Sequence, residues 1–125
     1  MKGILIFCGL ILASGVAALV WHFVTPRHYG QPFDNVPAVS LKDVSAEPET
    51  HQKNELRLEG TIERQCPTTG CWFYISDGQG HNLRIEMSSV ITTLPNIVGK
   101  RAVVEGYLEK NGQEYELNGK AAEIR

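Results

Sequence analysis

The stretch QCPTTGCWFYISD, residues 65–77, decides the fold of this chain. At its centre, Pro67 to Gly70 has the composition of a tight turn, because proline presets φ and glycine accepts a positive φ. The residues on both sides are typical of two antiparallel strands. If four loop residues close this hairpin, Cys66 lies directly opposite Cys71 on the same face of the sheet. That separation is one that a disulfide can bridge.

The same hairpin register determines which side chains point inward and which point outward. It places Arg64 opposite Phe73, and because side chains alternate along a strand, Phe73 faces inward while Trp72 and Tyr74 face outward. A three-residue loop after this strand, GQG, sets Arg84 of the next strand opposite Tyr74. We therefore expect Trp72, Tyr74 and Arg84 to share one outer surface.

Alternation between apolar and polar residues predicts further strands, at 55–63, 82–87, 102–108 and 121–124. The dipeptide Asn111-Gly112 is a strong signal for a hairpin turn, and a turn centred there pairs Leu108 with Tyr115. The next dipeptide of this kind, Asn118-Gly119, predicts a bulge before the last strand.

The expected order is three strands, a short helix, and two strands, which is the connectivity of an OB-fold. The fold class is therefore all-β, a five-stranded Greek-key barrel. Residues 88–99 lack strand alternation and predict a short helix or turn, and the Ser40 hydroxyl is expected to cap another short helix. Gly60 and Gly106 suit the strand curvature of a small barrel. A meander sheet backed by one helix is the alternative.

An apolar segment opens the chain and predicts one N-terminal transmembrane helix. Residues 4–24 are almost entirely apolar and long enough to cross a hydrocarbon core. Small residues at 13–18 also suit cleavage of a signal peptide, but apolar character continues past them through Trp21, which favours an uncleaved anchor. Lys2 precedes the run, whereas Arg27 after it is balanced by Asp34. The positive-inside bias therefore places the N-terminus in the cytoplasm.

Three parts follow from this division of the chain. Residues 1–24 are a transmembrane anchor or signal sequence, residues 25–37 a linker rich in proline and glycine, and residues 38–125 the OB-fold domain. The linker is expected to hold the barrel off the bilayer. The expected location is the inner (cytoplasmic) membrane, single-pass, with the barrel on the extracytoplasmic, periplasmic side. Thiols tend to be oxidised there, which fits a pair of facing cysteines.

The barrel domain is mildly acidic. From Val36 onward thirteen Asp and Glu residues oppose ten Lys and Arg residues. The domain therefore lacks the basic surface that binding to a nucleic-acid backbone usually requires. We expect a solvated acidic face made of Glu59, Glu63, Glu105 and Glu109. No catalytic triad, carboxylate pair or phosphate loop stands out in the sequence, so we expect neither an enzyme nor a cofactor.

Three segments carry a resemblance to known proteins: LRLEGTI at 56–62, the stretch from Cys66 to Asp77, and GKRAVVEG at 99–106. They resemble bacterial extracytoplasmic OB-fold proteins, grouped with the tRNA-anticodon-binding-like (nucleic-acid-binding-type) OB superfamily. The resemblance runs from about Val39 to the C-terminus. It implies an OB-fold, and through the superfamily label it implies nucleic-acid binding. The anchored architecture is also similar to the haem chaperones of cytochrome c maturation, but no histidine follows His81, where that family carries its haem-binding His-x3-Tyr motif.

Two interpretations of Cys66 and Cys71 remain open. The first is a structural disulfide that pins the hairpin, worth about 2 kcal/mol for so short a loop. The second is a metal or thiol-redox carrier, with His81 or His51 as a further ligand. A zinc site needs four ligands at tighter spacing, and His81, paired with Asp77, belongs to the opposite end of its strand. The disulfide is therefore favoured, and no metal site is assigned.

We interpret the chain as a membrane-anchored extracytoplasmic OB-fold binding or accessory module. Trp72, Tyr74 and Arg84 are the candidate ligand-binding residues, because outward aromatic rings on a small barrel need a cover. That cover is either a ligand stacked on the rings, or the short helix of the linker, the segment 88–99 or a partner, and both interpretations stay open. The expected partner is a protein of a membrane or envelope complex, or a small oligomeric ligand. The alternatives are a metal or thiol-redox carrier that uses Cys66 and Cys71, and single-stranded nucleic-acid binding, which fits the charge badly.

Overall fold

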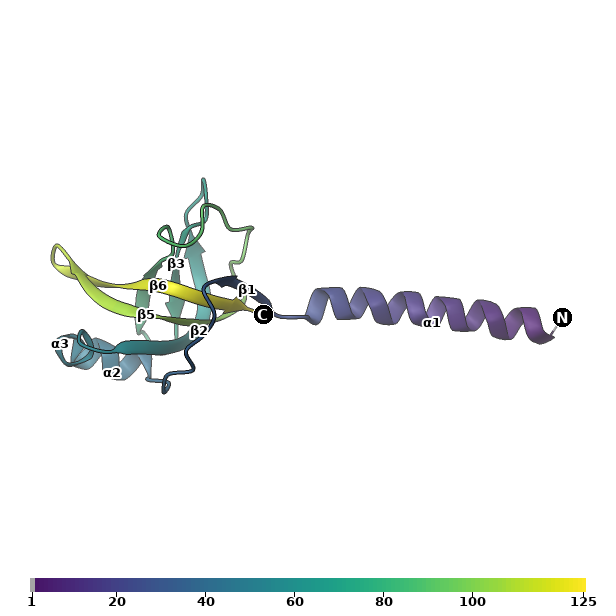
Figure 1. Cartoon of the computed structure of the whole chain (residues 1–125), viewed down its shortest axis with the longest axis horizontal. Helices are drawn as coiled ribbons and strands as arrows, with labels where there is room; N and C mark the ends of the chain where they lie inside the picture. Colours follow the sequence, from purple (N-terminus) through teal and green to yellow (C-terminus); the bar gives the residue numbers. More distant parts are fainter. Residues whose placement is uncertain (1) are drawn as a thin grey trace.

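A computed structural model describes residues 2–125 of the chain, and it consists of a small β-barrel with one long helix that extends away from it (Figure 1). This helix, α1, runs from Lys2 to Val24. Every side chain from Lys2 to His22 is exposed, although most of them are apolar. By length and composition α1 could cross a membrane, and a signal sequence near the N-terminus has the same properties.

Five strands close the barrel: β2 (Glu55–Gln65), β3 (Trp72–Ser76), β4 (Asn82–Glu86), β5 (Arg101–Asn111) and β6 (Glu114–Ile124). Around the barrel the order is β2, β3, β4, β6, β5 and back to β2. The pair β4–β6 is parallel and the other pairs are antiparallel. The long connection that makes β4 and β6 parallel neighbours gives the Greek-key order of an OB-fold. The predicted fold class is confirmed.

The barrel interior is filled by apolar side chains from alternate positions of every strand. Phe73, Ile75, Leu58, Ile85 and Leu117 have no exposed surface. The alternation in the sequence therefore identified the inward residues of β2, β3 and β4 correctly, since a strand directs successive side chains to opposite faces.

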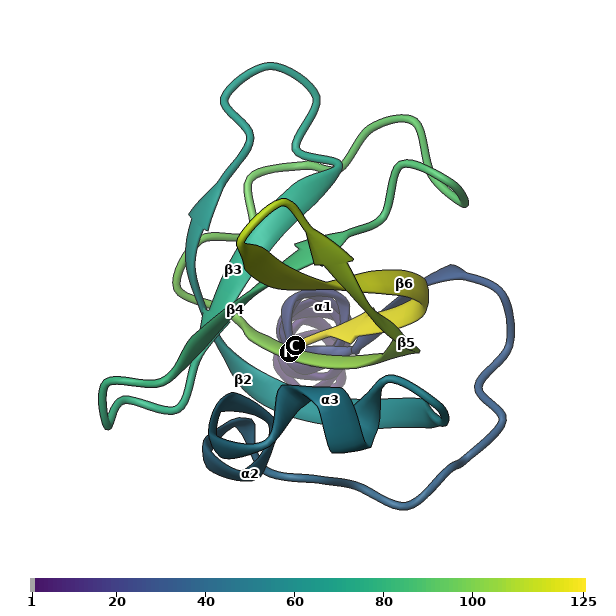
Figure 2. The same ribbon diagram turned by 90° about the vertical axis from the view of Figure 1, so that its left-hand side faces the viewer.

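Two short helices precede β2 and close one side of the barrel (Figure 2). They are α2 (Leu41–Ala46) and α3 (Pro48–His51). As predicted, Ser40 caps α2, because its Oγ accepts a hydrogen bond of 3.1 Å from the backbone N–H of Asp43. Leu41 and Val44 are buried against the core. The segment 88–99 forms turns at 88–90 and 98–99 and is otherwise irregular, so a turn and not a helix follows β4.

The residues predicted as a linker lie along the barrel. Within them, Arg27–Gly30 form strand β1, which pairs with the last residues of β6. Farther along, Ala38 forms a parallel bridge with Arg57, and the N–H of Val39 donates to the carbonyl oxygen of Arg57 over 2.9 Å. Only residues 25 and 26 separate α1 from β1, so the barrel is tied closely to the end of the helix.

A bulge in β2 changes the hairpin that contains the cysteines. Ile62 lies opposite Ile75, but Arg64 lies opposite Tyr74, because Glu63 is an extra residue in the strand. The N–H of Cys66 consequently donates to the carbonyl oxygen of Trp72 over 3.0 Å. The prediction that Cys66 lies directly opposite Cys71, and Arg64 opposite Phe73, is therefore wrong.

The β5–β6 hairpin is also shifted from the predicted register. Asn111 pairs with Glu114, so the turn consists of Gly112 and Gln113, and Leu108 lies opposite Leu117. Gly112 has φ 66°, as the first central residue of a type II′ turn requires. The predicted bulge is present, with Lys120 as its extra residue.

Glu105 corrects the prediction of a solvated acidic face. Its side chain is fully buried, and its Oε1 lies 3.1 Å from Nη1 of Arg57 on the neighbouring strand. Its Oε2 accepts a hydrogen bond of 2.7 Å from the backbone N–H of Asp34. The segment between α1 and the barrel therefore covers this carboxylate, which the alternation pattern alone placed in solvent.

Candidate functional site

The outer surface of β3 and β4 carries the aromatic residues expected there. Tyr74 lies opposite Arg84, and Trp72 lies opposite Glu86. Both rings are half-buried and both lie outside the core. Their centroids are 6.0 Å apart with an interplanar angle of 87°, an edge-to-face arrangement that aromatic pairs prefer.

Each ring has an arginine stacked on one face. The Arg84 guanidinium lies 4.7 Å from the centroid of Trp72, and the Arg64 guanidinium lies 4.0 Å from the centroid of Tyr74. Both distances are within the range of a cation–π interaction. We call these four residues the Arg–aromatic layer. Arg64 joins the layer because the bulge at Glu63 directs it outward, next to Tyr74.

The two arginines differ in their charge partners. Arg84 donates to Glu86 over 3.0 Å, and its Nε lies 3.4 Å from Glu116. The hydrogen bond to Glu86, followed by the nearby negative charges, raises the pKa of Arg84. Within residues 2–125 Arg64 makes no ion pair, and its side chain interacts there only with the Tyr74 ring. Arg64 therefore offers an uncompensated positive charge at the surface.

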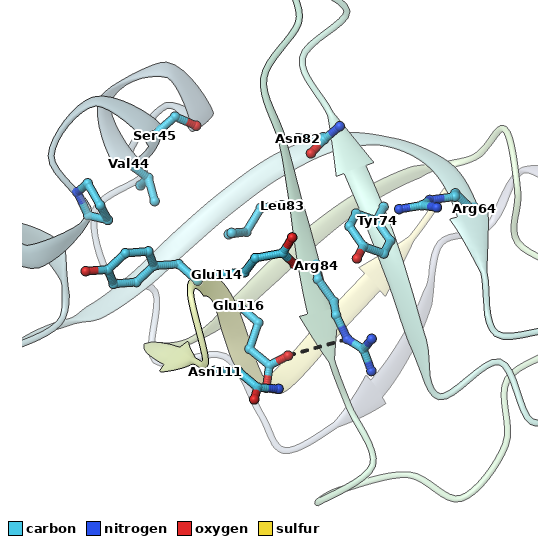
Figure 3. A pocket seen from close by; sticks show the side chains of 12 residues that line it. Val44, Ser45, Arg64, Tyr74, Asn82, Leu83, Arg84, Asn111, Glu114 and Glu116 are labelled. Carbon is cyan, nitrogen blue, oxygen red and sulfur yellow. Dashed lines mark ion pairs between the residues drawn. The ribbon is translucent and has the colours of Figure 1, made fainter.

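Beside the Arg–aromatic layer is a hollow of about 450 Å³ (Figure 3). One wall is the sheet, where Arg64, Tyr74 and Arg84 line it, and the other walls come from α2, α3 and the β5–β6 hairpin. Tyr115 on this hairpin donates a hydrogen bond of 3.2 Å to Glu49 of α3, which joins the two walls. The remaining lining residues are Val44, Ser45, Pro48, Asn82, Leu83, Asn111, Glu114 and Glu116.

The structure therefore brings two of the three predicted ligand-binding residues to one hollow. Tyr74 and Arg84 line it, whereas Trp72 does not line it and stacks against Arg84. Sequence reasoning missed Arg64, because an ideal hairpin register paired it with an inward residue. It also missed Glu116, which lies opposite Arg84 in the parallel β4–β6 pair, and Glu114, which lies beside the turn of the β5–β6 hairpin.

The second candidate region is the loop between β2 and β3, which holds two free thiols. The Oγ1 of Thr69 lies 3.7 Å from Sγ of Cys66 and 3.0 Å from Sγ of Cys71. The two sulfurs are therefore no farther apart than the sum of these distances. The predicted disulfide is not formed in this structure, and both sulfurs are within contact distance of the Thr69 hydroxyl instead.

The segment 88–99 braces this thiol loop. The N–H of Leu94 donates to the carbonyl oxygen of Thr69 over 2.8 Å. From the other side, the amide of Gln65 donates to the carbonyl oxygen of Pro95 over 2.7 Å and accepts from the N–H of Ile97 over 3.0 Å. Gly70 has φ 71°, a conformation that other residues rarely adopt. The loop is thus held in one shape by its neighbours.

The loop environment stabilises a thiolate at Cys66. Hydrogen bonding by Thr68, followed by the backbone N–H groups of Thr69, Thr68 and Gly70, lowers the pKa of Cys66 to about 6. The Sγ of Cys66 and the Oγ1 of Thr68 are 3.2 Å apart. Donors that converge on a sulfur favour its charged form, which is the reactive form of cysteine.

The chain's donor atoms do not support the metal-carrier interpretation. Among the described residues no three His, Cys, Asp or Glu side chains are grouped so that they could hold a metal ion. His81 pairs instead with Asp77, with 2.6 Å between Nδ1 and Oδ2, beyond the opposite end of β3. The two cysteines thus have no third ligand beside them.

Comparisons with known proteins add a likeness of fold to solved structures. No family model matches the sequence, and no curated protein matches it. A chain in the crystal structure of the S. pombe Stn1-Ten1 complex superposes with a TM-score of 0.49 and 9% identity, over 70% of this chain and 75% of that one. The assignment to the OB-fold rests on this chain's own strand order and register.

Proposed function

We propose that this chain is a membrane-anchored OB-fold module that docks a protein partner, or a small oligomeric ligand, on the Arg–aromatic layer. The observation that carries this proposal is the pair of arginines stacked on two outward aromatic rings at the edge of a hollow of about 450 Å³. Trp, Tyr and Arg are the residues most enriched in the energetic centres of protein interfaces. This sheet face and the loops beside it are also where OB-folds bind their ligands.

The charges around the hollow favour a polypeptide ligand over a nucleic acid. Arg64 is free to pair with a carboxylate, while Glu114 and Glu116 line the same hollow and would repel a phosphate backbone. The ring face of Tyr74 is already covered by Arg64, so a base could stack there only by displacing the guanidinium. A peptide segment that presents an acidic side chain to Arg64 fits these constraints.

The helix α1 supports the membrane part of the proposal. Its 23 residues extend over roughly 35 Å at 1.5 Å per residue, enough to cross a hydrocarbon core. Exposed apolar side chains all around a helix need a nonpolar environment. With Lys2 on the cytoplasmic side, the barrel would lie outside the inner membrane, within reach of an envelope complex. A cleaved signal sequence is the alternative for this segment.

The experiment is co-purification of the full-length chain from membranes, followed by identification of the bound partner and mass measurement of the chain. The double variant Trp72→Ala, Tyr74→Ala should lose the partner, whereas Tyr107→Ala, an exposed tyrosine on β5 that does not line the hollow, should keep it. Urea unfolding of each variant checks that the barrel is intact. Retention of every partner by the folded double variant would show that another surface binds.

The nucleic-acid alternative makes a different prediction in the same preparation. A chain that binds single strands should retain an oligonucleotide at low salt and release it steeply as salt rises. The intact mass decides between an uncleaved anchor and a removed signal sequence, because cleavage would remove most of α1.

A further inference from the structure

The thiol loop opens onto a hollow of its own. A space of about 450 Å³ is lined by Cys66 and Gly70 of the loop and by Leu94, Asn96 and Val98 of the opposite segment. Gln65, Pro67 and Thr68 complete the lining, so Cys66 is the one titratable side chain in it. This hollow shares no residue with the one beside the Arg–aromatic layer. The thiol loop is therefore a separate candidate site.

Three features of this loop point to one chemistry. An accessible thiol lies among hydroxyl and backbone N–H groups, a second thiol contacts the same Thr69 hydroxyl as the first, and a hollow leads to the first thiol. We propose that Cys66 and Cys71 are a dithiol that reduces a disulfide, with Cys66 as the attacking thiol and Cys71 as the resolving thiol. The co-reactant is a disulfide that enters the hollow beside Cys66.

The reaction balances as two thiol–disulfide exchanges. The Cys66 thiolate attacks one sulfur of the incoming disulfide, that S–S bond breaks, and the other sulfur leaves as a thiolate. Cys71, as its thiolate, then attacks Sγ of Cys66, closes the Cys66–Cys71 bond and releases the second sulfur. Two electrons and two protons pass to the co-reactant, which ends as two thiols, while this chain ends as one internal disulfide.

The geometry assigns the two cysteines different roles. Thr68 and the loop N–H groups surround Cys66, and the lowered pKa of this thiol makes it mostly thiolate at neutral pH. Cys71 lies nearer to Thr69 than Cys66 does and does not line the hollow. A disulfide would therefore reach Cys66 first, and Cys71 would act only after the mixed disulfide has formed.

The first test is the pH profile of thiol reactivity, measured on the full chain in detergent with a chromogenic aromatic disulfide. All proteins carry Cys8→Ser. With Cys71→Ser added, reaction at Cys66 should be half-maximal near pH 6. At about pH 5.5 it should be roughly ten-fold faster than reaction at Cys71 in the Cys66→Ser protein, even though a thiolate of lower pKa is intrinsically less nucleophilic.

A pair of threonine variants checks the cause of this profile. Thr68→Val removes the hydroxyl beside Cys66 and should move the half-maximum to higher pH. Thr92→Val, at an exposed threonine outside the lining of this hollow, should leave it unchanged. A half-maximum near about 8.5 for Cys66, the value of an ordinary thiol, would overturn the assignment of Cys66 as the attacking group.

The second test follows the products by mass after acid quenching. The reduced chain is mixed either with glutathione disulfide or with a disulfide-bonded peptide. The disulfide that oxidises the chain faster identifies the source of the co-reactant as a small molecule or a polypeptide. In both cases the chain with Cys66 and Cys71 should lose two hydrogen atoms and carry no adduct. The Cys71→Ser protein should stop at the mixed disulfide on Cys66.

Two outcomes would overturn the proposal. One is an absence of oxidation by both disulfides, and the other is a mixed disulfide that persists when Cys71 is present. Unfolding midpoints of the serine variants should match that of the parent protein, because both thiols are partly exposed in a loop.

Discussion

Arg57 and Glu105 lie opposite each other on β2 and β5, and their side chains form an ion pair of 3.1 Å. The Glu105 side chain is fully buried, whereas a quarter of the Arg57 side chain (26%) is exposed. The second carboxylate oxygen of Glu105 accepts the N–H of Asp34. One buried charge thus connects two strands of the barrel with the segment that leads from α1.

Replacement of Arg57 should destabilise the barrel strongly. Arg57→Met leaves the Glu105 carboxylate buried without its counter-ion and removes the contact of the guanidinium with the Phe33 ring at 4.8 Å. Because an isolated buried charge is costly, the free energy of unfolding should fall by about 3 kcal/mol. Urea denaturation of the full chain in detergent measures this change.

Arg101 provides a matched control for this substitution. It also joins β5 to β2, through an ion pair of 2.9 Å with Glu59, but about half of each side chain is exposed. Arg101→Met should therefore cost less than about 1 kcal/mol. An equal loss of unfolding free energy in the two variants would mean that the burial of Glu105 does not determine how much its ion pair stabilises the barrel.

The segment that follows β1 should loosen in acid. The hydrogen bond with Lys120, followed by that with Glu55, lowers the pKa of Asp34 below its usual value. A carboxyl whose pKa is depressed by folding stabilises the fold fully above its unfolded pKa of about 3.9, and this contribution is lost as the pH falls through the folded value. Attachment of this segment should therefore weaken progressively below about pH 4.

Hydrogen exchange at the amide of Gln31 reports this loosening, because that N–H donates to the carbonyl oxygen of Lys120. The Arg125 amide, bonded to the carbonyl oxygen of Arg101, serves as an internal reference for the intrinsic effect of pH. Relative to that reference, exchange at Gln31 should rise in acid. Asp34→Asn should show high exchange already at neutral pH and no acid step, and identical curves for both proteins would disprove the role of Asp34.

The barrel should lie directly on the membrane surface if α1 spans the bilayer. A hollow of about 220 Å³ is lined by His22 and Thr25 at the end of α1 and by Lys100 of the β4–β5 loop. The turn at Gln113 lies at the end of the barrel remote from α1 (Figure 1). In a chain whose native cysteines are serine, a fluorophore on Lys100→Cys should be quenched by headgroup-labelled lipids. A fluorophore on Gln113→Cys should not, and equal quenching would place the barrel differently.

This placement differs from the expectation of a spacer between the membrane and the barrel. Proline and glycine in residues 25–37 gave no periodic pattern, so the sequence predicted a linker. Residues 27–30 form β1 because their backbone groups pair with β6, and Glu105 and Lys120 hold the following part of the segment by binding Asp34. Neither partner is near the segment in sequence, and local patterns cannot identify such long-range contacts.

The barrel itself could be predicted because its core follows simple alternation. Ile62, Phe73 and Ile85 occupy the inward positions that a period of two requires. The bulge before the last strand was predicted from Asn118-Gly119, but the bulge at Glu63 was not, since an extra residue in a strand changes the register by one without altering the composition. The bulge at Glu63 is what brings Arg64 to Tyr74 and moves Cys66 out of register with Cys71, so the details of both candidate sites depended on it.

Gly106 should tolerate no side chain, because the second bulge brings two backbones together there. It lies opposite Gly119, beside the extra residue Lys120, and a Cβ at position 106 would lie 2.8 Å from the Cα of Gly119 and collide with the carbonyl oxygen of Asn118. These are backbone atoms of a closed barrel and cannot turn aside as a side chain would. Gly106→Ala should therefore lower the free energy of unfolding by about 1–3 kcal/mol, the usual cost of overpacking.

Glu109→Ala, at an exposed position of the same strand, should change the free energy of unfolding by less than about 0.5 kcal/mol in the same urea titration. A Gly106→Ala protein as stable as the parent would show that the two strands can separate at the bulge without loss of the barrel.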